Sequence, residues 1–120
     1  MLNEMAASDP RFFVGLDEMV RQHMPEKAYS VYKKESFKQF LPRPSDDDHP
    51  TPRRFQRWAM NKDFEWYQGE INSESGMPDG LGIYILPGEL ITFGHRVKDK
   101  LHGQMVTIYD DGLKKVGAFK

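Results

Sequence analysis

Residues 64–120 read FEWYQGEINSESGMPDGLGIYILPGELITFGHRVKDKLHGQMVTIYDDGLKKVGAFK, and glycines recur along them at a nearly constant spacing. Gly94 and Gly117 are 23 residues apart, and Gly69 and Gly94 are 25 apart. An approximate repeat of this length is typical of a stacked array of small supersecondary units. We therefore expect this part of the chain to be repetitive, with the glycines at equivalent positions.

Apolar runs and turn residues alternate within this stretch as β-hairpins require. Ile83–Leu86 and Leu90–Phe93 flank Pro87-Gly88, in which proline presets φ and glycine accepts positive φ. Met105–Tyr109 is followed by Asp111-Gly112, a strong signal for a tight hairpin turn. The pattern predicts about five short antiparallel strands.

Ordered sets of residues in this stretch resemble the MORN repeat, whose pattern is Tyr-x-Gly-Glu, then His-Gly-x-Gly, then a turn glycine. The first copy reads Tyr67-Gln68-Gly69-Glu70, Asp79-Gly80-Leu81-Gly82 and Gly88. The second copy reads Thr92-Phe93-Gly94-His95, His102-Gly103-Gln104-Met105 and Asp111-Gly112, and Lys115-Val116-Gly117-Ala118 opens a third. Four residues depart from the pattern: Asp79, Thr92, His95 and Met105.

The resemblance implies a twisted ribbon of hairpins that serves as a scaffold or binding surface and has no chemistry of its own. The residues that carry the motif are Tyr67, Gly69, Glu70, Gly80, Gly82, Gly88, Gly94, His102, Gly103, Gly112 and Gly117. If Gly117 needs positive φ or close strand approach, a β-branched residue there disrupts the last hairpin.

The N-terminal residues show helical patterning. Asp9-Pro10 forms a typical helix start, and apolar side chains then recur at helical spacing as far as Met24. A second helix is expected from Pro25 to about Phe40. These amphipathic helices have two destinations, the hairpin sheet of the same chain or a groove on another protein.

A proline-rich linker separates these helices from the hairpins. Residues 42–50 read PRPSDDDHP, and after them Phe55, Trp58 and Ala59 mark one face of a short third helix. The expected fold class is α+β: N-terminal amphipathic helices and an extended linker, followed by a short MORN-like antiparallel β-hairpin array. The expected divisions are a helical segment at 1–41, the linker with its short helix at 42–63, and the hairpin repeats at 64–120.

Composition restricts the classes of function. The net charge is −1 and the pI about 6.4, which disfavours a general nucleic-acid binder. The absence of cysteine excludes disulfides and thiolate metal sites and fits a reducing compartment. No apolar run approaches the roughly 18 residues that a membrane-spanning helix needs.

The candidate metal and catalytic groups are few. His95 and His102 lie seven residues apart within the repeat pattern, which favours a structural role. Asp46-Asp47-Asp48-His49 lacks the spaced carboxylates of a calcium loop and is typical of a solvated linker. No nucleophile, phosphate-loop or zinc-protease motif is present. We expect no enzymatic activity, no cofactor and no small-molecule substrate.

Aromatic and basic residues are the candidates for binding. The predicted partner-binding residues are Trp66, Tyr84, Phe93, Tyr109, Phe12, Tyr29, Tyr32 and Phe40. For the aromatic residues of the repeats, packing within the sheet is the alternative. Arg53, Arg54 and Arg57, beside Phe55 and Trp58, form a possible anionic-surface contact.

The sequence thus favours a non-catalytic adaptor, a small accessory subunit that binds other subunits of a large assembly through its sheet and its N-terminal helices. The expected setting is an intracellular, reducing compartment, in a cytoskeletal, ciliary or organelle complex such as a mitochondrial one. Two alternatives stay open: a peripheral module that binds anionic lipid through the three arginines, and a free-standing domain whose helices cover its own sheet.

Overall fold

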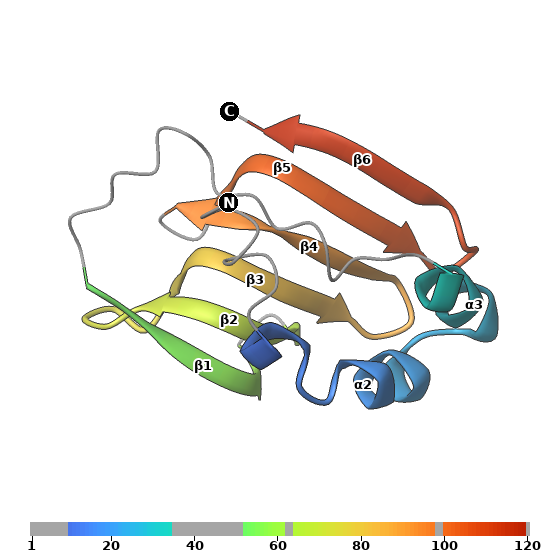
Figure 1. The fold of residues 1–120 in the computed structure, drawn as a ribbon, viewed down its shortest axis with the longest axis horizontal. Helices are drawn as coiled ribbons and strands as arrows, with labels where there is room; N and C mark the ends of the chain where they lie inside the picture. The colour runs from blue at the N-terminus through green and yellow to red at the C-terminus, as the bar shows by residue number, and fades with distance from the viewer. Residues whose placement is uncertain (1–9, 35–51, 62–63, 98–99, 120) are drawn as a thin grey trace.

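The computed structural model describes residues 10–34, 52–61, 64–97 and 100–119 (Figure 1). A short 3-10 helix and two α-helices come first, and six strands follow. Their bounds are η1 Pro10–Phe13, α2 Leu16–His23, α3 Glu26–Lys34, β1 Arg53–Met60, β2 Trp66–Asn72, β3 Pro78–Leu86, β4 Leu90–Val97, β5 Lys100–Tyr109 and β6 Lys114–Phe119. The predicted α+β class is confirmed.

The six strands form one sheet in the order β1-β2-β3-β4-β5-β6, and every neighbouring pair is antiparallel. Each strand therefore pairs with its neighbour in sequence, which is the simplest result of successive hairpins. The five strands expected after residue 64 are present as β2–β6. The turns at Pro87-Gly88 and Asp111-Gly112 lie where the sequence predicted them, with φ of 76° at Gly88 and 88° at Gly112.

The predicted third helix is wrong, because residues 53–60 form strand β1. The pairing of β1 with β2 shifts register between Gln56 and Ala59, which indicates a β-bulge. Such a bulge adds a residue and changes which face the following side chains share. Phe55 and Trp58 consequently pack on the same core although they are three residues apart, and this spacing imitates that of a helix.

The predicted first helix is divided into two. Gly15, with φ of 74°, separates η1 from α2, and the backbone turns there. The second predicted helix is present as α3 as far as Lys34, and Phe40 lies outside the described residues. Helix α2 buries Leu16 and Val20, and α3 buries Ala28 and Tyr32.

The helices pack on the sheet of their own chain. The main core joins Phe12 and the buried side chains of α2 and α3 to one face of the sheet, here called the helix face. The sheet residues of this core are Leu81, Ile83, Ile85, Ile91, Phe93 and Ile108. Figure 1 shows α2 and α3 at the end of the sheet where β3 turns into β4 and β5 into β6. At this end the amide of Gly88 donates to the carbonyl of His23 at 2.8 Å.

Candidate interaction surface

The repeated glycines lie in one row across the sheet. Gly69 pairs with Gly82, Gly82 with Gly94, Gly94 with Met105, and Met105 with Gly117. Four strands thus place glycine at the same level, and only β5 interrupts the row. The nearly constant spacing in the sequence is the consequence, because hairpins of similar length return the chain to the same level of the sheet.

A tyrosine closes over this row in the first repeat. A Cβ placed on Gly82 would lie 2.2 Å from Cε1 of Tyr67, so the ring occupies the space that a side chain would need. The Tyr67 hydroxyl donates to the carbonyl of Glu70 at 2.5 Å. The Glu70 carboxylate in turn accepts the amide of Leu81 at 2.9 Å. These contacts tie β2 to β3 on the face opposite the helices, here called the motif face.

The second repeat lacks this arrangement. Thr92 occupies the level of Tyr67 and Tyr84 in the sheet, and its Oγ1 lies 3.0 Å from Oγ1 of Thr107. A hydroxyl pair therefore replaces the aromatic ring. His95, which follows the row glycine as Glu70 does in the first repeat, is fully buried.

The first residues of the third repeat are exposed. A Cβ placed on Gly117 would meet nothing within 4 Å, and Gly117 is absent from the glycines with positive φ. The expectation that Gly117 needs positive φ or close strand approach is therefore wrong. No ring covers it, and its neighbour Val116 is 64% exposed.

Two tyrosines and an arginine fill the motif face next to the glycine row. The rings of Tyr67 and Tyr84 lie 4.7 Å apart, and the guanidinium of Arg96 lies 3.6 Å from the centre of the Tyr84 ring. Arg96 also forms an ion pair with Glu65 at 3.3 Å. Burial raises the pKa of the Tyr67 hydroxyl and the pKa of the Tyr84 hydroxyl well above their ordinary value. These groups stabilise the sheet in their neutral form.

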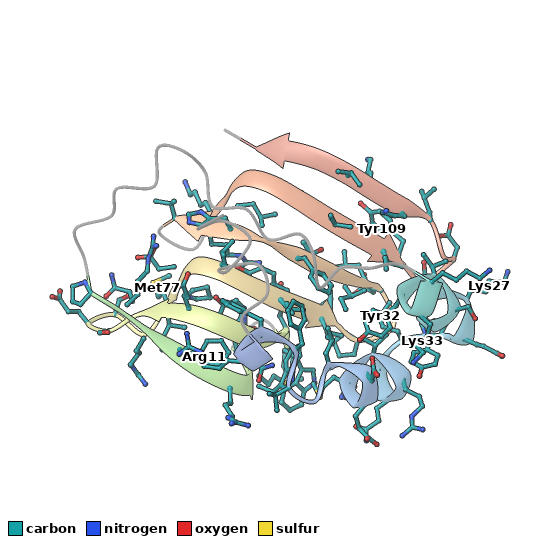
Figure 2. The ribbon with its side chains drawn as sticks, viewed as in Figure 1. Arg11, Lys27, Tyr32, Lys33, Met77 and Tyr109 are labelled. Atoms are coloured by element: carbon teal, nitrogen blue, oxygen red, sulfur yellow. The ribbon has the colours of Figure 1, made fainter. Side chains whose placement is uncertain are left out.

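Half of the predicted partner-binding residues lie in the interior. Phe12, Tyr32, Phe93 and Tyr84 are at most 5% exposed, so the prediction that they contact a partner is wrong. The strands and helices of the same chain bury them, which periodicity alone does not reveal. Figure 2 shows Tyr32 on α3, and its hydroxyl donates to Asp17 of α2.

The remaining predicted aromatic residues are half-buried or lie outside the description. Trp66 packs beside His23, with ring centres 5.6 Å apart, and Tyr29 lies 6.1 Å from Tyr32. Tyr109 is half-buried at the end of β5 (Figure 2). Phe40 lies outside the described residues. None of these residues is fully exposed in the structure.

The three arginines of β1 do not act as one group. Arg53 forms an ion pair with Asp79 at 3.1 Å, and the two side chains are only 14% and 3% exposed. Arg54 and Arg57 are exposed.

The aromatic residues beside these arginines are used within the chain. The rings of Phe55 and Phe12 lie 5.2 Å apart, edge to face, and Trp58 Nε1 donates to the carbonyl of Val14 at 2.9 Å. The combined basic and aromatic surface that a lipid contact requires is therefore reduced to two exposed arginines.

The two edges of the sheet differ. Edge strand β1 carries the irregularity between Gln56 and Ala59, and Phe55 and Trp58 pack beneath η1 and the residues that follow it. Bulges are a common way to prevent unwanted strand addition. Edge strand β6 pairs with β5 without a break over six residue pairs, and Val116 is exposed on it. Sequence reasoning missed Val116 and the exposed Leu113, although KKVGAF lacks the aromatic residue that begins the first repeat.

The described residues offer no metal centre and no membrane span. Within 10–34, 52–61, 64–97 and 100–119, no group of three or more His, Asp or Glu side chains could hold a metal ion. In the same part of the chain, every helix is too short or too polar to cross a membrane. The side chain of His102 and the segment Asp46–His49 lie outside the description.

Comparison with known proteins gives no relative for this arrangement. No protein-family model, no curated protein and no solved structure matches the chain.

Proposed function

We propose that the chain is a non-catalytic adaptor, a small subunit that joins other proteins of a larger assembly through a MORN-like hairpin sheet. Support for the hairpin array comes from the glycine row and from Tyr67, whose ring lies over Gly82. The motif residues hold one another in place and leave no polar group directed at a substrate. Their role is to build a rigid platform.

One observation carries the proposal: the sheet is closed at β1 and accessible at β6. The N-terminal helices cover the helix face of their own sheet, so we assign partner binding to the sheet edge instead of the helices. Lys114, Lys115 and Val116 are exposed along β6. An unprotected edge strand is a site where another chain can add main-chain hydrogen bonds.

Co-purification tests the proposal. The full chain, expressed with a tag in cells that contain it, should retain at least one protein in a stoichiometric amount through gel filtration. The double variant Arg54→Glu/Arg57→Glu is the matched control, because it changes charge at the opposite edge and should leave this partner bound. A chain that elutes alone in every fraction would contradict an adaptor role.

The same preparation separates the adaptor from the lipid-binding alternative. If the function is protein binding, the wild-type chain should not sediment with vesicles of phosphatidylserine and phosphatidylcholine. Sedimentation that disappears in the double arginine variant would favour the lipid alternative.

A further inference from the structure

The hydrogen-bonding groups of β6 can be assigned to its two sides. The amide of Tyr109 donates to the carbonyl of Leu113 at 2.9 Å, so residue 113 points its backbone groups toward β5. In an antiparallel ladder alternate residues point the same way. Lys115 and Gly117 therefore also point toward β5, and they pair there with Thr107 and Met105.

The intervening residues of β6 point their backbone groups away from the sheet. These residues are Lys114, Val116 and Ala118. Each presents one N–H donor and one C=O acceptor to an additional strand. Figure 1 shows β6 as the outermost strand, on the side of β5 away from β4.

Side chains alternate between the two faces of β6. Val116 pairs with Val106, which packs against the main core, so Val116 lies on the helix face. Lys115 pairs with Thr107 and lies on the motif face. An added strand would therefore meet a valine on one face and a lysine on the other.

Charge along β6 is of one sign. Lys114 and Lys115 are exposed, and the strand carries no acidic side chain. Positive charge on an edge repels a strand of like charge and favours one with carboxylates opposite the lysines. A second copy of this chain would bring two further lysines to the interface and would gain no ion pair.

We propose that β6 receives an extended acidic segment of a partner protein as a seventh, antiparallel strand. Antiparallel addition continues the pattern of the whole sheet and gives slightly more stable pairing than parallel addition. In that orientation the segment reads, from N to C, an apolar residue opposite Val116 and then two acidic residues opposite Lys115 and Lys114. This inference rests on the proposed adaptor function and names the chemistry of its partner.

Fluorescence anisotropy with labelled peptides tests the orientation and the charge. The probe TVTVEET has the apolar-acid-acid order, TVTVKKT reverses the charge, and TEEVTVT carries the acids at the other end. We expect TVTVEET to bind the full-length chain at least about tenfold more tightly than either control. Equal affinities for the three peptides would overturn the proposal.

Two variants test the site. Val116→Pro removes an N–H that points away from β5, so the ladder to β5 stays intact while the edge loses a donor. Val116→Thr keeps the N–H and the branched shape and is the matched control. Binding of TVTVEET should be lost in the first variant and kept in the second, and unchanged binding in Val116→Pro would exclude β6 as the site.

A charge exchange keeps the proposal testable if the proline variant does not fold. Lys114→Glu/Lys115→Glu should lose TVTVEET and bind TVTVKKT instead. If this variant prefers neither peptide, the proposal is wrong.

Two further results separate this proposal from its rivals. A wild-type dimer in sedimentation velocity that Val116→Pro dissociates would assign β6 to a second copy and overturn the acidic partner. A co-purified protein that stays bound to Val116→Pro would leave the adaptor function standing and remove β6 from it.

Discussion

Gly82 and Gly117 lie in the same row of the sheet, yet their surroundings are opposite. Gly82 is enclosed by Tyr67 on the motif face, and a Cβ there would lie within 2.2 Å of the ring. Gly117 meets nothing within 4 Å on the outermost strand. The same sequence motif therefore fixes packing at one side of the sheet and leaves an exposed strand at the other. The difference shows that the repeat determines the path of the backbone, while covering side chains determine which part of it is stable.

The largest effect should come from detaching the helices. Leu16 is buried at 1% exposure beneath the helix face, and Leu16→Ala should lower the free energy of unfolding by about 2–5 kcal/mol. Urea denaturation followed by circular dichroism measures the change. Val14→Ala is the control, because Val14 is 44% exposed. If both variants were as stable as the wild type, the helices would not stabilise the sheet.

A smaller loss is expected at the enclosed glycine. Gly82→Ala places a methyl group against the Tyr67 ring and should cost about 1–3 kcal/mol, because overpacking forces the ring out of its place. The double variant Gly82→Ala/Tyr67→Ala should recover part of the loss due to the clash. Additive losses in the double-mutant cycle would show that the two residues do not interact.

Alkaline pH should weaken the motif face. Burial raises the folded-state pKa of Tyr67 and of Tyr84, whereas an unfolded tyrosine titrates near about 10. The unfolded chain therefore loses protons first, and stability should fall above about pH 10 by about 1.4 kcal/mol per pH unit for each such tyrosine. The slope between pH 10 and pH 11 (about one unit) should be smaller in Tyr84→Phe. An identical slope would show that Tyr84 does not contribute.

The smallest effect is expected at the exposed glycine. Gly117→Ala should change the free energy of unfolding by less than about 0.5 kcal/mol, because the new methyl group has open space and φ there is outside the left-handed region. Thermal unfolding of this variant and of Gly82→Ala under one buffer gives the comparison directly. A loss as large as that of Gly82→Ala would mean that β6 is covered as closely as β3.

Local signals predicted most of the sheet. The turns at Gly88 and Gly112 and the strands that they join were predictable, because turn residues and apolar runs act over a few positions. The common level of Gly69, Gly82 and Gly94 was implied by their spacing.

The strand β1 could not be predicted in this way. Its bulge between Gln56 and Ala59 brings Phe55 and Trp58 to one face, and the resulting spacing of three residues is that of a helix. Bulges depend on the partner strand, which local periodicity does not include.

The sequence by itself determined the hairpins and the repeated glycine level, since these follow from short-range turn chemistry and from the length of each hairpin. Only the tertiary structure decided that Phe12, Tyr32 and Phe93 belong to one core and not to a partner contact. It also decided that β6 has an exposed edge and that β1 carries a bulge. The physical reason is that an apolar face is the same in sequence whether its own chain or another one covers it, and only long-range packing chooses between the two.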